Sequence, residues 1–370
     1  MKSCTYLYAM LILCLCMSGC SKSPQPVTDG NPSWSPSMPA EDSSGAQVVA
    51  QDLRTPWAID FKGEVLYISE RPGSIVMVEN GQASRQQVSL KKKLYQEGEA
   101  GFLGFALHPE DHGETKAFSY YTYEEDGEIF GRVVTLILGE SVWEETALLL
   151  DRIPGAIFHN GGRLAIGPDG MLYVTTGDAR QDKLSQDKSS LAGKILRMTL
   201  TGEVPDDNPI PGSYIYSYGH RNPQGLAWTQ DGVLYSSEHG PSGSPGGHDE
   251  LNRILPGTNY GWPLIIGDEE KDGMQPPLYH TGDVALAPSG MTADSSGRLL
   301  VATLLGQRII RYTPDSGSDS GQSQVEVLLQ NLGRIRDIRL HQGSFLFITN
   351  NTDGRGTPQA GDDKLYRMNL

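Results

Sequence analysis

The chain has 370 residues, is 38% hydrophobic and carries a formal net charge of −15. Such an acidic protein is not expected to bind nucleic acid or an anionic membrane surface electrostatically, so an anionic ligand would need locally clustered arginines. All four cysteines lie within the first 20 residues. A disulfide framework, a cysteine-ligated zinc site and a thiol nucleophile are therefore excluded from the rest of the chain.

The N-terminal segment has the pattern of a bacterial export signal. Lys2 is followed by an apolar run that is too short to span a bilayer, and the run ends in the sequence MSGC at Cys20. This ending resembles a lipobox, in which the cysteine is lipidated and becomes the first residue of the mature chain. We predict a lipoprotein signal peptide over residues 1–20 and a lipid anchor on Cys20. The alternative is an ordinary signal peptide that is cleaved elsewhere.

The rest of the chain divides into a linker and one globular domain. Residues 21–46 are rich in Ser, Pro and Gly and predict a flexible tether. Residues 47–370 show many short alternating runs bounded by Gly, Asp and Pro, with little helical periodicity, and so predict an all-β domain. We expect it to be exported and held by lipid alone, on the outer face of the bacterial cytoplasmic membrane or in the periplasm.

One pattern recurs along this domain: a turn with glycine, then a short strand that ends in small or polar residues. Six copies, whose starts are 47 to 65 residues apart, predict a six-bladed β-propeller of four-stranded antiparallel blades. Pairing of the first strand with the last would close the ring and remove exposed sheet edges. A pair of β-sandwiches or a seven-bladed propeller is the alternative. The copies are FKGEVLYISE at 61, ETKAFSYYTY at 114 (degenerate), GPDGMLYVTTGD at 167, TQDGVLYSSEHG at 229, DSSGRLLVATL at 294 and HQGSFLFITN at 341.

Polar clusters adjoin these copies, three of them one short segment before the repeated strand. Equivalent places in a propeller face one mouth of its central channel, so we expect these side chains to converge on a ligand. Each cluster alone fits a turn, a solvated loop or a strand face. The clusters are FHNGGRL with His159, YGHRNPQGLA with Arg221 and Asn222, EHGPSGSPGGHDELN with Asp249 and Glu250, and GRIRDIRL with Arg334 and Arg336.

Together these motifs resemble the soluble aldose sugar dehydrogenases related to quinoprotein glucose dehydrogenase, which use pyrroloquinoline quinone. The resemblance covers nearly the whole expected domain. It implies a six-bladed propeller that oxidises the anomeric hydroxyl of aldose sugars to lactones by hydride transfer to the quinone, with calcium polarising the cofactor. The similar motifs include LRTPWAIDF, EAGFLGFALHPE, HNGGRLAIGPDGMLYVTTGD, GKILRMTLTGEVPDDNP, YGHRNPQGLA, GTNYGWP, APSGM and RIRDI.

The resemblance also implies roles for the polar residues that face the cofactor. His159 corresponds to the general base, which a neutral imidazole can be near physiological pH. Arg221 and Asn222 correspond to groups that contact the quinone, and a guanidinium there would stabilise developing negative charge. Arg334 and Arg336 correspond to partners of the cofactor carboxylates. Local arginines and a divalent cation are what an acidic protein needs to hold such a ligand.

Two calcium sites are implied in the same way. The backbone carbonyls of Gly240 and Pro241 correspond to ligands of the calcium shared with the cofactor, since calcium prefers oxygen ligands and polarises the group it binds. Glu250 and the carbonyl of Tyr260 correspond to a second, structural calcium site. The implied partners are an aldose sugar and an electron acceptor of quinone or dye-like type.

The sequence departs from the family at two places near the expected cofactor. Glu99 stands where relatives usually carry glutamine, and a carboxylate there would repel an anionic cofactor unless it is protonated or turned away. Leu305 or Gly306 stands where the glucose dehydrogenase branch has a lysine. This second departure favours the aldose dehydrogenase branch.

Two other functions remain open at this stage. A calcium-dependent sugar lactonase would use carboxylates in the channel, for which Glu238, Asp249 and Glu250 are the candidates, but it gives no role to the arginines of RIRD. A non-catalytic binding lipoprotein would keep the propeller without the cofactor, and Glu99 is the feature that favours it.

Overall fold

The computed structural model describes residues 45–110, 113–243, 246–314 and 324–369. Their regular structure is almost entirely β, with one 3-10 turn, η1 (Asp182–Ser185), among the described residues. The predicted signal peptide, Cys20 and the linker as far as residue 44 lie outside them. No helix in the described part of the chain is both long and apolar enough to cross a membrane.

Four sheets have four antiparallel strands each, and three of these sheets are built from consecutive strands. The strands of these three are β10 (Leu164–Ile166), β11 (Leu172–Thr176), β12 (Lys194–Met198) and β13 (Ile215–Tyr218); β14 (Pro223–Trp228), β15 (Leu234–Glu238), β16 (Glu250–Ile254) and β17 (Tyr279–His280); and β18 (Pro288–Ala293), β19 (Leu299–Thr303), β20 (Arg308–Thr313) and β21 (Gln324–Gln330).

The fourth of these sheets joins the two ends of the domain. Its order is β1-β24-β23-β22, and Gln47 of β1 is the register partner of Arg367 of β24. The predicted pairing of the first strand with the last is therefore confirmed, and it covers an edge that β24 would otherwise expose. Its strands are β1 (Gln47–Ala50), β22 (Ile335–His341), β23 (Ser344–Thr349) and β24 (Leu365–Asn369).

The remaining strands form one sheet of eight, in the order β2-β3-β4-β5-β9-β8-β7-β6. It consists of two antiparallel runs of four strands, which a short parallel pairing of β5 with β9 joins. The all-β, four-stranded antiparallel architecture is thus confirmed, although two of the expected blades share one sheet. Its strands are β2 (Pro56–Lys62), β3 (Val65–Glu70), β4 (Ser74–Glu79), β5 (Gln82–Ser89), β6 (Phe102–Leu107), β7 (Lys116–Glu125), β8 (Glu128–Leu138) and β9 (Val142–Pro154).

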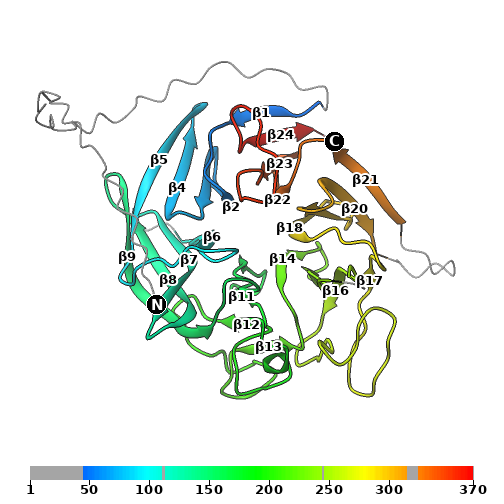
Figure 1. The fold of residues 1–370 in the computed structure, drawn as a ribbon. Coiled ribbons are helices and arrows are strands. Elements are labelled where there is room, and N and C mark those ends of the chain that lie inside the picture. The colour runs from blue at the N-terminus through cyan, green and yellow to red at the C-terminus, as the bar shows by residue number, and fades with distance from the viewer. Residues whose placement is uncertain (1–44, 111–112, 244–245, 315–323, 370) are drawn as a thin grey trace, which may run out of the picture. The chain divides into compact units, whose positions relative to one another are not determined.

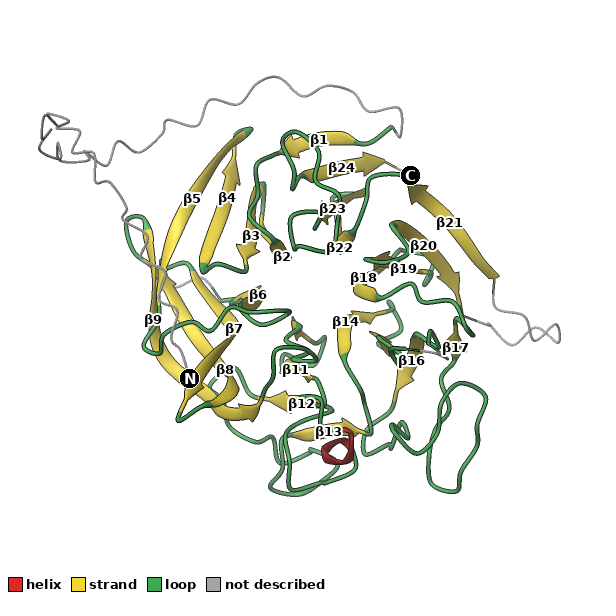
Figure 2. Cartoon of the chain, viewed as in Figure 1, coloured by secondary structure: helices red, strands yellow, loops and turns green. Residues whose placement is uncertain are grey.

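The sheets lie around a common centre, and the labelled strands nearest to it are β2, β6, β14, β18 and β22 (Figures 1 and 2). These inner strands contact one another in turn, β6 with β2, β2 with β22, β22 with β18 and β18 with β14. The repeated sequence copies form the second strand of each run, such as β11 and β15, after glycine turns. Gly170 and Gly232 have φ values of +75° and +83°, which a side chain would disfavour.

Apolar side chains fill the spaces between neighbouring sheets and between the two halves of the eight-stranded sheet. The largest cluster packs Phe105 edge-on against Trp143, with ring centroids 5.5 Å apart. Burying each such side chain contributes about 1.5–3 kcal/mol. The core therefore lies between the sheets, and the ends of the inner strands are left to carry polar groups.

Candidate active site

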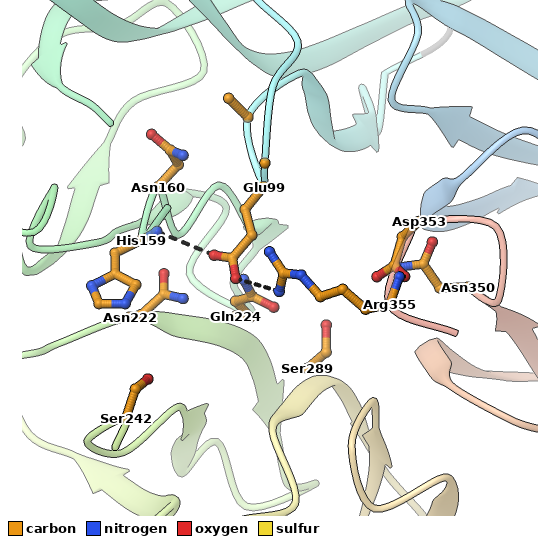
Figure 3. A network of polar contacts seen from close by, with 12 residues as sticks. Glu99, His159, Asn160, Asn222, Gln224, Ser242, Ser289, Asn350, Asp353 and Arg355 are labelled. Carbon is orange, nitrogen blue, oxygen red and sulfur yellow. Dashed lines mark hydrogen bonds and ion pairs between the residues drawn. The ribbon is translucent and has the colours of Figure 1, made fainter. Parts of the chain in front are cut away.

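One end of the ring of inner strands collects the polar clusters. In each antiparallel pair the inner strand begins where the second strand ends, as the register pair Pro223↔Glu238 shows. Loops before the inner strands and loops after the second strands therefore meet at one mouth, where Figure 3 shows side chains from several loops facing a common space. The residues that we assign to this mouth are Arg71, Glu99, His159, Asp178, Arg221, Asn222, Glu238, Arg334, Arg336, Asp353 and Arg355.

His159 and Asp178 form a hydrogen-bonded pair between the loops before β10 and after β11. His159 Nδ1 lies 2.8 Å from Asp178 Oδ1, and Trp262 Nε1 donates to the other carboxylate oxygen at 3.0 Å. An ionised carboxylate only accepts hydrogen bonds, so Nδ1 carries the proton and Nε2 is left with its lone pair. The imidazole is 16% exposed. It is oriented and accessible, as a proton acceptor must be.

The HRN sequence is fixed by a buried carboxylate. Glu238, at the end of β15, accepts the backbone N–H groups of Arg221 and Asn222 and pairs with His220 Nδ1 at 2.9 Å. The turn is therefore stabilised without the side chains of Arg221 and Asn222. Asn222 Oδ1 accepts the N–H of Gly161 at 3.0 Å, which leaves its Nδ2 without a partner among the described residues. Arg221 lies over the Trp262 ring at 5.4 Å.

Arg334 and Arg336 differ in their partners. Arg334 donates to Asp353 Oδ2 at 2.9 Å, so its charge is balanced. Arg336 donates to the neutral oxygens of Gln224 (2.8 Å) and Ser289 (3.3 Å), and its Nε has no partner among the described residues. Burial lowers the pKa of Arg336 to about 9, which still leaves it cationic at neutral pH.

Glu99 directs its carboxylate into the mouth, where two donors of the protein bind it (Figure 3). Its carboxylate accepts Arg355 Nη1 at 2.9 Å and the backbone N–H of His159 at 3.1 Å. Burial alone would raise the pKa of Glu99, but the positive charges of His239 and Arg355 and these hydrogen bonds lower it to about 2. Because burial also lowers the pKa of His239 to about 4, Arg355 is the lasting positive charge at neutral pH.

Three buried arginines at this mouth make no ion pair with a carboxylate within the described ranges. Arg71 donates to the carbonyls of Gly98 and Ala100, Arg221 to His239 O and Ser242 Oγ, and Arg336 to neutral side chains. Each is at most 6% exposed. Because an uncompensated buried charge is costly, this arrangement is expected where an anionic ligand completes the site.

The residues of the expected cofactor-calcium site lie in two loop segments that touch. A side chain on Gly240 would meet the carbonyl oxygens of Gly247 and His248 at 2.1 and 2.3 Å, so only glycine allows this approach. Asp249 pins the same segment by accepting the Gly240 N–H at 2.9 Å. Pro241 follows at the partly exposed surface, so a cation here would be bound mainly by carbonyl oxygens, which suits calcium.

The second expected calcium pair is not brought together by any contact among the described residues. Glu250 lies opposite Glu238 on neighbouring strands and accepts Asn252 Nδ2 at 3.0 Å. Burial and the charge of Glu238 raise the pKa of Glu250 to about 8. The ring of Tyr260 stacks on His220 at 4.8 Å, and its hydroxyl donates to Arg253 O. Tyr260 thus has a packing role in addition to any role of its carbonyl.

Several residues of the mouth have no signal in the sequence strong enough to single them out. Asp178 sits in the sequence TTGDAR, where it resembles an ordinary turn residue. Arg71 and Arg355 lie in turns outside the polar clusters that the sequence picks out. Arg355 and Glu99 are 256 positions apart. Leu305, near the place where the glucose dehydrogenase branch has a lysine, is 55% exposed and lies in a turn after β19.

Comparison with known proteins identifies the chain. The family model "Glucose / Sorbosone dehydrogenase" matches residues 53–365. The chain belongs to the glucose/sorbosone dehydrogenase family. It is 27% identical over 339 residues to aldose sugar dehydrogenase YliI of Escherichia coli, covering 82% of this chain and 88% of the relative.

Within the glucose/sorbosone dehydrogenase family, solved structures resemble this chain over most of its length. The PQQ-bound aldose sugar dehydrogenase of Streptomyces coelicolor is 35% identical with a TM-score of 0.78, covering 86% of this chain and 95% of that one. An oxidoreductase (glucose dehydrogenase) of Thermus thermophilus is 40% identical with a TM-score of 0.79, covering 87% and 98%.

For a third relative, the match to this chain covers only about half of the relative's length. Quinoprotein glucose dehydrogenase B of Acinetobacter calcoaceticus is 31% identical over 261 residues, which cover 61% of this chain. The chain spans about half (54%) of the length of that relative. The resemblance inferred from the motifs is confirmed at the level of the family, and this chain is an oxidoreductase of it.

Proposed function

We propose that the chain oxidises the anomeric hydroxyl of aldose sugars to lactones, with pyrroloquinoline quinone as hydride acceptor and calcium bound beside it. The observation that carries the proposal is the joint occurrence, at one mouth, of an oriented His159–Asp178 pair and buried arginines without anionic partners. The names of the relatives support the same chemistry. The six-bladed propeller belongs to this proposal, with the eight-stranded sheet counted as two blades.

The residues present fit an anionic, oxygen-rich cofactor. Asn222 Nδ2 and Arg336 Nε are buried donors without a partner among the described residues, and Asn350 Oδ1 is a buried acceptor in the same state. Together with the Arg221 guanidinium they would hold the cofactor, while the carbonyls of Gly240 and Pro241 would hold calcium. The quinone, when bound, supplies an electrophilic carbon that accepts hydride.

The chain's own residues carry the proton chemistry. His159 Nε2 takes the proton of the anomeric hydroxyl, and Asp178 stabilises the imidazolium that results. Arg221 stabilises negative charge that develops on oxygen, in a site with little water to screen it. Charge stabilisation and general-base catalysis each contribute factors of about 10² to 10⁴ in rate.

Two of the carboxylates that a calcium-dependent lactonase would need in the channel accept backbone N–H groups instead. Asp249 accepts the N–H groups of Gly240, Leu286 and Ala287, and Glu238 fixes the Arg221 turn. No group of three or more His, Cys, Asp or Glu side chains in the described part of the chain is arranged to bind a metal ion. The dehydrogenase is therefore the better-supported function.

Three parts of the proposal concern features beyond the mouth. Lipidation at Cys20 would hold the enzyme outside the bacterial cytoplasmic membrane, with residues 21–46 as tether. A second calcium would bind near Glu250 and the Tyr260 carbonyl. Electrons would leave to an acceptor of quinone or dye-like type.

Reconstitution tests the proposal. The purified chain without its first 44 residues is stripped of metal, then supplied with quinone, calcium or both, and dye reduction on a panel of aldoses is measured. Activity should require both additions and should fall by about 10³-fold or more in His159→Ala, while His108→Ala, remote from the mouth, should behave as the parent. Absence of activity on every aldose, with quinone demonstrably bound, would exclude the proposed reaction.

A further inference from the structure

Several hydrogen bonds fix the position of Glu99 at the mouth. Its backbone N–H donates to Ile157 O at 2.7 Å, and its side chain accepts the N–H of His159 two residues further on. Arg71 donates to the carbonyls on both sides of Glu99, those of Gly98 and Ala100. The Glu99 segment and the segment before β10 are thus held together along their length, and Glu99 takes part in fixing the backbone of His159.

Arg355 reaches this carboxylate from the other side of the mouth. It belongs to the loop that follows β23, and Figure 3 shows its side chain extending to Glu99 from that loop. Its guanidinium also lies 5.3 Å from the centre of the Phe158 ring, which neighbours His159. The same loop supplies Asp353 to Arg334, so it balances one positive and one negative group of the mouth.

The charge at Glu99 matters because the mouth is built for an anion. With two N–H donors and a pKa of about 2, Glu99 is ionised at physiological pH. Its side chain is 15% exposed, so water screens its field only in part. Two charges interact several times more strongly in such surroundings than in bulk water. An isolated carboxylate here would oppose the attraction of Arg221 and Arg336 for the ligand.

We propose that Arg355 is a positioning residue that acts through Glu99. By pairing with Glu99 across the mouth, it cancels a negative charge that would repel an anionic cofactor, and it aims the carboxylate at the His159 N–H. The Glu99–Arg355 pair thus takes the place of the neutral glutamine that relatives usually carry, without loss of cofactor affinity. This inference rests on the proposed function only where it names the ligand as a carboxylate-bearing quinone.

Quinone binding to a set of variants tests the mechanism. The dissociation constant of pyrroloquinoline quinone is measured with saturating calcium by quenching of tryptophan fluorescence, for which Trp262 near Arg221 is a reporter. Arg355→Met should weaken binding by about tenfold or more, which corresponds to about 1.4 kcal/mol. Glu99→Gln and the double variant Glu99→Gln/Arg355→Met should bind within about threefold of the parent, because neither carries the repelling charge.

Matched variants separate charge from shape. Arg355→Lys keeps the positive charge and should keep most of the affinity. Arg311→Met removes an arginine of a different pair, that with Glu326 on β21, and should change nothing. Unchanged binding in Arg355→Met would overturn the proposal. A double variant as weak as Arg355→Met would also overturn it, since Arg355 would then act on the ligand directly.

A measurement on the ligand-free protein keeps the inference separate from the proposed function. Arg355→Met should lower the melting temperature, because it leaves Glu99 buried without its cation, and adding Glu99→Gln should recover most of that loss. If the parent bound no quinone at all while this coupling was present, the proposed function would fail and the positioning of Glu99 by Arg355 would stand. Additive effects of the two substitutions would overturn the pairing itself.

Discussion

His159 occupies a backbone conformation that its residue type seldom adopts. Its φ is +61°, and such a conformation in a non-glycine residue costs about 1–3 kcal/mol. Glu99 accepts the backbone N–H of His159, and Asp178 is hydrogen-bonded to its ring Nδ1, so both the backbone and the imidazole are fixed. Such strain persists where several surrounding contacts fix the conformation. Here those contacts set the direction of the His159 imidazole, which we propose as the general base.

Replacing Asp178 tests the orientation of that base. In Asp178→Asn the amide can present its NH₂ group to Nδ1 and so stabilise the wrong tautomer of His159. We expect kcat to fall by about 10²- to 10⁴-fold while quinone affinity changes little, because the cationic groups remain. Steady-state kinetics together with fluorescence titration measure both quantities. A loss of quinone affinity with kcat unchanged would contradict the assigned role.

Arg336 offers a test of the idea that the site is incomplete without its ligand. In Arg336→Met a buried cation without an anionic partner is replaced by an apolar side chain of similar length. We expect the melting temperature of the ligand-free protein to stay the same or to rise, while quinone binding weakens by about tenfold or more. Calorimetry and titration check this.

Arg334→Met is the contrasting case for the same experiment. It removes the partner of Asp353, so it should lower the melting temperature of the ligand-free protein. If Arg336→Met destabilised the protein as much as Arg334→Met, Arg336 would be a structural residue and not part of an anion site.

Neighbouring strands β15 and β16 place Glu238 and Glu250 opposite each other. The pKa of Glu250 is raised above its unfolded value of 4.5 to about 8, so the folded state binds the proton more tightly. The stabilisation that Glu250 contributes through its raised pKa is fully present below pH 4.5 and is lost as the pH rises through about 8. In metal-free buffer, Glu250→Gln should therefore melt at a higher temperature than the parent at pH 8–9 and close to it at pH 5. A constant difference across this range would contradict the shift.

The elements were predictable from sequence where their cause is local. Glycine turns such as that at Gly170, followed by alternating strands, predict the repeated hairpins and their number. The parallel pairing of β5 with β9 has no such signal, because it joins segments far apart in the chain. The same holds for the site: His159 and Arg221 were found through their motifs, whereas Asp178 and Arg355 act through partners that only the fold brings near.

The pairing of β1 with β24 joins the two ends of the domain in one sheet. A chain that begins at Leu53 lacks β1, and β24 then becomes an exposed edge. Relative to a chain that begins at Gly45, we expect a loss of about 2–4 kcal/mol from the missing apolar contacts and an increased tendency to associate. Denaturant unfolding and size-exclusion chromatography measure these effects. Equal stability of the two chains would show that closure does not hold the ring together.

The molecule as a whole is acidic, yet three buried arginines without a carboxylate partner in the described part of the chain lie at one mouth: Arg71, Arg221 and Arg336. The most direct test of this account is calorimetric titration of the metal-stripped domain with pyrroloquinoline quinone, with and without calcium. We predict saturable binding of one quinone per chain, strengthened by calcium and lost when Arg221 and Arg336 are both replaced by methionine. Absence of binding under both conditions, or binding that survives loss of both arginines, would contradict it.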